Sequence, residues 1–306
     1  MPTLQQFRYL VAVADHLHFR RAADAVHVTQ PTLSAQLREL EGKLGVQLVE
    51  RARGGVRLTP PGEQIAARAR AVLRDVADIV ALAQQGSDPL SSTIRVGVVG
   101  SLGGYFLPLV IPALHAAHPR LTFYVREGWA ADLLTRLRDG ALDALFLPLP
   151  VEAADLVAAP LFHEPLHVVL PADHPLVGRD VIAPGDLAGE VLMTLESGHR
   201  LHDTVAELAQ ATGAHLSLDY EGTSLDTLRQ MVATGLGLSV LPALYVRSEV
   251  AREALVVARP LAAPQPGRDI GLVWRRQAVQ GSAFGTIADL IRTTLARDAP
   301  EVRVIG

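Results

Sequence analysis

Four leucines at helical spacing mark the stretch around which the first part of the chain is organised. Steps of three and four residues predict a helix that buries one apolar stripe in a core. Thr29 stands where its N-cap is expected, and Pro31 falls in the first turn, where a missing N–H costs nothing. The leucines are Leu33, Leu37, Leu40 and Leu44.

Two shorter helices are predicted before this one. Ala22, Ala23 and Val26 belong to the nearer helix, whose adjacent alanines allow another helix to cross closely, and His27-Val28 forms the turn after it. The first helix carries an apolar face that should brace the other two. That face comprises Leu4, Phe7, Leu10, Val11 and Ala14.

The side of the leucine helix opposite its apolar stripe is small and polar, with few acids. A helix that lies in the major groove of DNA needs such a face. The residues expected to face bases are Gln30, Pro31, Thr32, Ser34 and Arg38.

The segment VQLVERARGGVRLT alternates around Gly54-Gly55, which predicts a two-residue hairpin. Arg51, Arg53 and Arg57 cluster there, and we expect them to contact phosphates or a minor groove. The alternative is a solvated basic hairpin.

A long helix is predicted from Pro60 to about Gln85, with Thr59 as its cap. Its apolar residues repeat as heptads, which favours pairing between two chains, although an amphipathic helix packed on its own domain is the alternative. The heptad positions are Ile65, Ala69, Val72, Val76, Ile79 and Ala83. Gly86 to Ser92 has the composition of a hinge-like linker.

The motif HFRRAADAVHVTQPTLSAQLRELEGKLGVQLVER closely resembles the winged helix-turn-helix of LysR-type transcriptional regulators, and the resemblance runs from Leu4 to about Ala83. It implies an all-α DNA-binding domain over residues 1–59, a dimerisation linker helix over 60–85 and a hinge over 86–92. It also implies homodimers that commonly assemble as homotetramers, and contact with RNA polymerase. The alternative is a small helical domain with a leucine core.

From Thr93 the pattern changes to alternating strands and helices, which implies a doubly wound α/β sheet. IRVGVVG, LTFYVREG and ALDALFLPL are predicted strands, with helices between them. A second set begins near Leu166, with a helix from Leu201, a strand SLDYEG, a helix from Ser224 and the segment LSVLPALYV. DIGLVWRR and a final helix follow.

This half resembles the effector domain of the same family, which has two lobes like those of periplasmic binding proteins. The resemblance implies an effector-binding domain over residues 93–306, with lobe I at 93–164 and 269–306 and lobe II at 165–268. The chain would cross between lobes near Glu164-Pro165 and Gly267-Arg268. Strand carboxyl ends should face a cleft between the lobes, where a small-molecule effector would bind.

Candidate effector residues follow the strands or begin the helices of this half. Ser101 to Gly104 opens a helix, where free N–H groups and the helix dipole favour an anion or hydroxyl group. The alternative for serine and threonine is ordinary helix capping. The candidates are Ser101, Phe146, Thr194, Glu196, His199, Arg200, Thr223 and Ser224.

Charge is unevenly distributed along the 306 residues, whose net charge is −4. Up to Arg57 there are eight basic and five acidic residues, a balance of +3, so the rest carries −7. A basic N-terminal segment followed by an acidic remainder fits a nucleic-acid-binding module joined to a separate domain. We see no signal-peptide pattern and no apolar run long enough to cross a bilayer, which favours a cytoplasmic protein.

The second half is most similar to the peroxide-responsive OxyR subgroup, through LPLVIPALHAAHP, PLFHEP, LESGHRLHDTVAEL and GTSLDTLRQMVATGLGLSVLPAL. The resemblance implies cysteines where this chain has Arg200 and Ala209, and the sequence contains no cysteine. Sensing by thiol oxidation is therefore impossible in this chain. Arg200 instead either holds a carboxylate or phosphate, or pairs at the surface with Asp203 or Glu196.

The sequence also leaves open that the protein is a constitutive regulator, or one that responds to a metal or a metabolite. Glu196, His199, His202 and Asp203 are a weak metal-ligand pattern, and we assign no metal or cofactor. A different class, a small-molecule binding protein or an enzyme with an accessory helical domain, is the alternative function. The absence of a Gly-x-Ser-x-Gly elbow, a Walker motif or an acid–base pair speaks against an enzyme.

Overall fold

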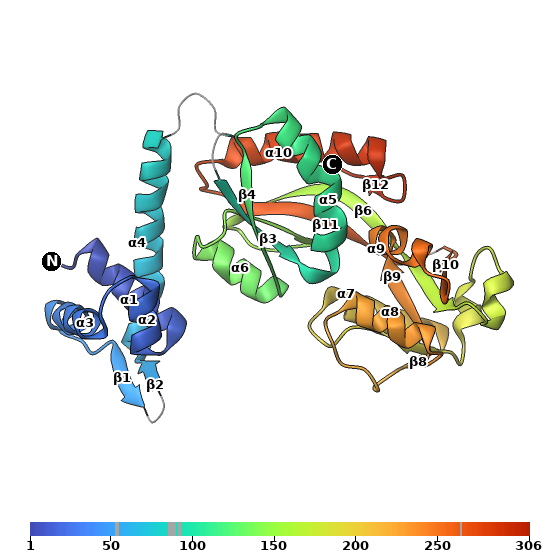
Figure 1. The fold of residues 1–306 in the computed structure, drawn as a ribbon, viewed down its shortest axis with the longest axis horizontal. Coiled ribbons are helices and arrows are strands. Elements are labelled where there is room, and N and C mark those ends of the chain that lie inside the picture. The colour runs from blue at the N-terminus through green and yellow to red at the C-terminus, as the bar shows by residue number, and fades with distance from the viewer. Residues whose placement is uncertain (53–54, 85–89, 91–92, 264) are drawn as a thin grey trace. The chain divides into compact units, whose positions relative to one another are not determined.

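The computed structural model describes residues 1–52, 55–84, 90, 93–263 and 265–306 (Figure 1). The chain forms two compact units, which are described separately. The described residues of the N-terminal unit form four helices and a hairpin. Its elements are α1 (Leu4–His16), α2 (Phe19–Ala25), α3 (Gln30–Leu44), β1 (Val49–Ala52), β2 (Gly55–Leu58) and α4 (Pro60–Gln84).

The apolar face of α1 differs from the predicted one. Leu10 is fully buried as expected, but Leu4 is 40% exposed, whereas Tyr9 and Val13 lie in the core. The helix packs against α2, α3 and α4, so its buried surface is set by three neighbours rather than by one stripe. Gln6 is also buried and completes a capping box with Thr3.

The hairpin register pairs Val49 with Leu58 and Ala52 with Gly55. Gly55 therefore belongs to β2, and the prediction that Gly54-Gly55 forms the turn is wrong at this position. The connecting residues 53 and 54 lie outside the described residues. The Thr59 hydroxyl accepts the Gly62 N–H at 3.1 Å, which confirms Thr59 as the cap of α4.

The C-terminal unit is built on a ten-stranded sheet with the order β4-β3-β5-β11-β6-β9-β7-β8, and β10 and β12 also pair with β6. The strands are β3 (Thr93–Val99), β4 (Thr122–Gly128), β5 (Ala144–Pro148), β6 (Leu156–Pro171), β7 (Val191–Met193), β8 (His215–Leu216), β9 (Leu238–Pro242), β10 (Val256–Pro260), β11 (Gly267–Arg275) and β12 (Arg303–Val304). The helices are α5 (Gly100–Ala117), α6 (Ala130–Arg138), η1 (Pro175–Gly178), η2 (Pro184–Leu187), α7 (Arg200–Thr212), α8 (Leu225–Ala233), α9 (Ala243–Ser248), η3 (Val250–Arg252) and α10 (Gly281–Asp298).

The sheet is mixed rather than wholly parallel. Strand β3 runs parallel to β4 and β5, but β11 is antiparallel to both β5 and β6. The predicted strand SLDYEG is also wrong, because the strand is His215–Leu216 and the residues after it are irregular. Tertiary pairing with β7 selects this short segment.

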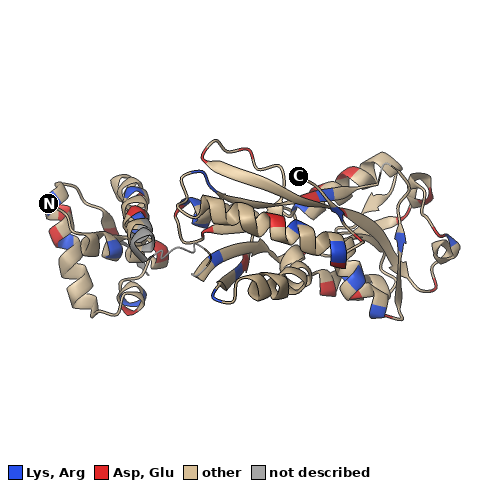
Figure 2. Ribbon diagram, turned by 90° about the horizontal axis from the view of Figure 1, so that it is seen from above, with Lys and Arg blue, Asp and Glu red and all other residues tan. Residues whose placement is uncertain are grey.

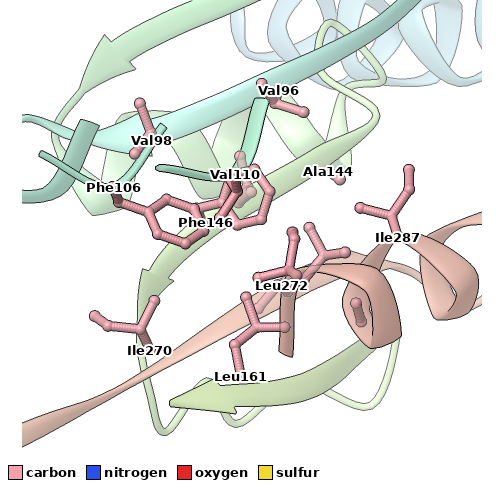
Figure 3. Packing of buried hydrophobic residues seen from close by; sticks show 14 of the residues in the cluster. Val96, Val98, Phe106, Val110, Ala144, Phe146, Leu161, Ile270, Leu272 and Ile287 are labelled. Atoms are coloured by element: carbon pink, nitrogen blue, oxygen red, sulfur yellow. The ribbon is translucent and has the colours of Figure 1, made fainter. Parts of the chain in front are cut away.

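Two hydrophobic cores divide the C-terminal unit into two lobes. The first lobe packs α5 and α10 against β3, β5 and β11, and its core includes Phe106, Phe146 and Ile287 (Figure 3). The second lobe packs α7, α8 and α9 around β9. Strand β6 takes part in both lobes, because Glu164 pairs with Arg268 of β11 and Leu166 pairs with Pro242 of β9.

Helix α5 is long and apolar enough to cross a membrane by length and composition, with a hydropathy of 1.2. The expectation that no apolar run is long enough to cross a bilayer is therefore wrong by the criteria of length and composition. Phe106, Val110 and Leu114 of this helix are buried in the first lobe. A core helix of a globular domain can have the same length and composition, because its buried face is apolar.

Candidate nucleic-acid interface and effector cleft

Helix α3 presents the predicted polar face to solvent. Leu33, Leu37 and Leu40 are at most 1% exposed on the opposite side, and they fix the helix in the core. The Thr29 hydroxyl accepts the Thr32 N–H at 3.4 Å and caps the helix as predicted. Most residues predicted to face bases are exposed, namely Gln30, Pro31, Thr32 and Arg38, and Ser34 is half-buried.

Helix α3 is tied to the hairpin by one carboxylate. Glu41 Oε1 accepts the backbone N–H groups of Leu48 and Val49, at 2.8 and 3.2 Å. Near the same end of the helix, Lys43 pairs with Glu39 at 2.7 Å. The hydrogen bond from Lys43 and then its charge lower the pKa of Glu39. These contacts leave the first turns of α3, rather than its last turn, open to a partner.

Only part of the predicted arginine cluster can be located. Arg57 is exposed on β2, directly opposite Glu50 of β1. Arg51 lies on β1, and its side chain is outside those described, as is the whole of Arg53. Figure 2 shows acidic and basic positions interspersed along the helices of each unit.

The heptad positions of α4 fall into two groups. Ala69 is buried, and Ile65 packs against the core of the N-terminal unit. Further along, Val72 and Ile79 are 39% and 63% exposed, whereas Val76 is half-buried. The side chain of Ala83 is outside those described. The first turns of α4 therefore pack on their own domain, and its later turns present apolar side chains to solvent.

A cavity of about 460 Å³ lies between the two lobes. It has the size of a small-molecule site. Three of the predicted residues, His199, Thr223 and Ser224, line it. Its remaining lining comes from the start of α5, the end of β4 and the start of α8, namely Gly100, Gly104, Tyr105, Glu127, Gly128, Trp129, Leu225 and Asp226.

Four lining residues were not predicted from the sequence, namely Tyr105, Glu127, Trp129 and Asp226. A usable signal was present, because Glu127 to Trp129 ends a predicted strand, and strand ends were the criterion for the other candidates. Asp226 lies two residues beyond Ser224. The Ser224 hydroxyl itself accepts the Thr227 N–H at 3.2 Å, so it caps α8 as well as facing the cavity.

A smaller cavity adjoins the first through His199 and Trp129, and it is lined by Ser101, Pro148, Arg200 and Arg268 among others. Arg200 donates from Nη2 to the carbonyl of Leu149 in the first lobe, at 3.3 Å. It therefore connects the lobes instead of pairing with Asp203 or Glu196.

His199 stacks on Trp129, with ring centroids 4.1 Å apart and planes tilted by 35°. Burial lowers the pKa of His199 below 6.5, although the Glu196 carboxylate acts in the opposite direction. The ring is therefore neutral at neutral pH. Its Nε2 atom is buried without a hydrogen-bond partner among the described residues.

Three predicted effector residues line neither cavity. Phe146 is 2% exposed and packs edge-on against Phe106 at 5.1 Å, because it lies two residues inside the end of β5 (Figure 3). Its assignment to the pocket is wrong for this reason. Thr194 is 4% exposed and its hydroxyl has no partner among the described residues, whereas Glu196 is half-buried.

The metal-ligand alternative receives no support within the described ranges, where no three His, Asp or Glu side chains are grouped to hold an ion. His202 Nδ1 lies 2.9 Å from the carbonyl oxygen of Leu195, so this ring nitrogen is engaged by the backbone.

A buried ion pair stands where the lobes join. Arg268 donates from Nε to Glu164 Oε2 at 2.8 Å and from Nη1 to the Ser101 hydroxyl at 2.7 Å. Glu164 Oε1 accepts the N–H of Leu244, the second residue of α9, at 2.9 Å. Ser101 is therefore held by the protein's own arginine, so its hydroxyl is already bonded where the residue lines the smaller cavity.

Comparisons with known proteins agree with this architecture. Residues 4–63 match the family "Bacterial regulatory helix-turn-helix protein, lysR family", and residues 87–296 match "LysR substrate binding domain". The DNA-binding transcriptional dual regulator OxyR of Escherichia coli K12 is 41% identical over 95% of both chains. A probable hydrogen peroxide-inducible genes activator of Streptomyces viridosporus is 38% identical over 99% of this chain and 97% of its own.

Solved structures of full-length relatives give the same result. OxyR of Pseudomonas aeruginosa with a cysteine-to-aspartate substitution is 40% identical, with a TM-score of 0.78 over 95% of this chain and 94% of that chain. A peroxide-bound cysteine-to-serine mutant of Corynebacterium glutamicum OxyR is 31% identical, with a TM-score of 0.66 over 97% and 93%.

A helix-turn-helix unit followed by a two-lobed regulatory unit defines a DNA-binding transcriptional regulator. The chain belongs to the LysR family of these regulators, in which it is an OxyR-like member without the cysteines of a thiol sensor.

Proposed function

We propose that the chain reads duplex DNA as a homo-oligomer, under the control of its interlobe cleft and without thiol oxidation. The observation that carries the proposal is the exposed polar face of α3 opposite the buried side chains of Leu33, Leu37 and Leu40. Such a helix enters a major groove with its first turns. In α3 these turns follow the cap residue Thr29, and Leu33 anchors them in the core.

The roles proposed for individual side chains follow from their exposure. Gln30 and Arg38 have the hydrogen-bonding groups that read base edges, with Thr32 and Ser34 between them and Pro31 as a shape contact. The hairpin arginines are proposed to bind the phosphate backbone, namely Arg51, Arg53 and Arg57. Such contacts supply affinity but little sequence information.

The homodimer is proposed to form through α4. Val72 and Ile79 are large apolar side chains left exposed on this helix, and pairing with a second copy would bury them. Two heads would then read half-sites about one helical turn apart. A homotetramer, contact with RNA polymerase and a cytoplasmic location are proposed as well, and membership of a family of transcriptional regulators supports them.

Control through the cleft is proposed because thiol chemistry has no reactive group here. The relatives are named for hydrogen peroxide, whereas this chain has Arg200 and Ala209 in the OxyR-like stretch and no cysteine. Arg200, bonded to the carbonyl of Leu149, connects the two lobes. A small-molecule effector that enters between the lobes would change their relative placement, and with it the spacing of the DNA-binding heads.

The test is an electrophoretic shift of the full chain with genomic fragments over a range of salt concentrations. We expect selected fragments to bind more tightly than bulk DNA, with affinity falling steeply as salt rises. Arg38→Ala should abolish the preference for selected fragments. Equal affinity for every fragment would contradict a sequence-specific regulator and would favour the alternative of a small-molecule binding protein with an accessory helical domain.

A further inference from the structure

The larger cleft is acidic. Among the described residues that line it, Glu127 and Asp226 carry charge, and lysine and arginine are absent. Glu127 comes from the end of β4 in the first lobe, whereas Asp226 comes from the first turn of α8 in the second. His199 adds no positive charge at neutral pH, because burial keeps its ring neutral.

Helices α5 and α8, whose first residues line this cleft, each have a carboxylate of the protein beside the first turn. The carboxylate of Glu127 lies against Gly103 of α5, where a methyl group on the glycine would overlap it. Asp226 stands in the first turn of α8, whose N-terminal N–H groups are also capped by Ser224. A helix N-terminus attracts an anion. Here carboxylates of the chain lie at the first turns of α5 and α8, and their negative charge argues against an anionic ligand.

The walls between the two carboxylates are aromatic. Trp129 is 38% exposed in the cleft, and Tyr105 lies one turn into α5. Tyr105 packs edge-on against Tyr245, whose hydroxyl is 2.9 Å from Asp226 Oδ1. Aromatic faces favour cations and apolar bodies alike. Arg229, which donates to the Tyr245 hydroxyl, is also paired with Glu253.

A buried polar atom of the same cavity lacks a partner. Nε2 of His199 is inaccessible to solvent and has no hydrogen bond among the described residues, although His199 lines the cavity. Buried polar atoms are rarely left unpaired in native proteins. A hydrogen-bonding group of a ligand would satisfy this nitrogen, as donor or acceptor according to the tautomer of the neutral ring.

We propose that the cleft binds a small organic cation, with its ammonium or guanidinium group between Glu127 and Asp226 and its body against Trp129 and Tyr105. The proposal names the ligand class of the proposed effector site and therefore rests on the proposed function. Binding would draw together residues of the two lobes, because each lobe supplies one carboxylate.

Tryptophan fluorescence tests the charge of the cleft without knowledge of the ligand. The chain has two tryptophans, and Trp274 is 8% exposed in the first core, so a quencher reaches Trp129 first. We expect cationic N-methylnicotinamide to quench at least about twofold better than iodide at low salt, after scaling to free N-acetyltryptophanamide. Glu127→Gln with Asp226→Asn should remove this preference. Glu207→Gln, on the exposed face of α7, is the matched control and should leave it unchanged.

Thermal shift of the full chain then tests ligand class with skeleton-matched pairs. Tryptamine is compared with indole-3-propionate, phenethylamine with 3-phenylpropionate, and cadaverine with pimelate. We expect at least one amine to raise the Tm, its carboxylate partner to have no effect, and Glu127→Gln to abolish the rise. Stabilisation by the carboxylates, no shift with any amine, or equal quenching by cation and anion would each overturn the proposal.

Binding to genomic DNA fragments is measured on the same preparations. If DNA binding is intact but the amines have no effect, only the ligand class fails. If sequence-specific DNA binding fails while the amines still bind, the proposed function fails and the assignment of the cleft stands.

Discussion

Arg268 of β11 and Glu164 of β6 form an ion pair of 2.8 Å at the junction of the two lobes, with side chains 6% and 0% exposed. The two residues are also direct partners in the strand register. Because the pair contacts Ser101 of α5 and Leu244 of α9 as well, it connects four elements at the place where β6 passes from one lobe to the other. Rotation of the lobes must occur about these atoms or break their bonds.

Removal of one partner of this pair should destabilise the C-terminal unit strongly. We expect Arg268→Leu or Glu164→Leu to lower the free energy of unfolding by about 3–5 kcal/mol, since a buried charge is left unpaired. Urea denaturation of the full chain measures the change. The exposed pair of Arg136 with Asp132 is the control, and Asp132→Asn should cost less than about 0.5 kcal/mol. Equal effects at both sites would show that the buried pair is dispensable.

Two helical glycines should respond in opposite ways to alanine. A methyl group on Gly62 would overlap the backbone carbonyl of Leu48, so Gly62→Ala should destabilise the N-terminal unit by about 1–3 kcal/mol. Gly42 of α3 has open space around it, and Gly42→Ala should stabilise by about 0.5–1 kcal/mol through helix propensity. Thermal denaturation followed by circular dichroism gives the sign, and a neutral Gly62→Ala would refute the close approach of α4 to Leu48.

The hairpin and α3 should contribute differently to DNA binding. Arg57→Ala should weaken binding to all sequences and reduce the slope of log affinity against log salt by about 1, since one phosphate contact is lost. Gln30→Ala should instead relax sequence choice, with little change in slope. Fluorescence anisotropy with specific and scrambled duplexes separates the two effects, and an unaltered slope in the arginine variant would rule out a phosphate contact there.

Hydrogen peroxide should leave the affinity for the selected DNA fragment unchanged. No cysteine is present to form a sulfenic acid or a disulfide, and the sequence holds three methionines. Footprints of purified protein before and after treatment test this, with intact mass as the control for methionine oxidation. A footprint that moves with peroxide at constant protein mass would contradict the expectation.

Stability should fall on mild acidification. Burial lowers the pKa of both His167 and His199 below the ordinary value of 6.5, so each binds fewer protons in the folded state than in the unfolded state. The contribution of these two histidines to the free energy of unfolding is fully present above pH 6.5. It is lost as the pH falls from 6.5 through the pKa of the folded state. Urea midpoints across this window measure the loss. His167→Gln should flatten the dependence, and an unchanged pH profile in that variant would exclude this histidine as a source.

Local patterns were sufficient for those elements whose stability is local. The α3 stripe, the Thr29 cap, the Thr59 cap and the strand around Val96 are encoded in runs of a few residues, and the structure contains them. Residues whose environment depends on several neighbours were predicted less well. Leu4 proved exposed and Phe146 proved to be core, because packing partners far away in the chain decide which side of an element is covered.

The sequence by itself determined the class of regulator, the polar face of α3, and the lack of any group for thiol chemistry, since each follows from residue types and their spacing. Only the tertiary structure decided that Glu127 and Asp226 share one cleft, that Ser101 is held by Arg268, and that Arg200 contacts the carbonyl of Leu149. These residues are separated by tens to more than a hundred positions along the chain. Their proximity is created by β6 and β11 passing between the lobes, which no local pattern specifies.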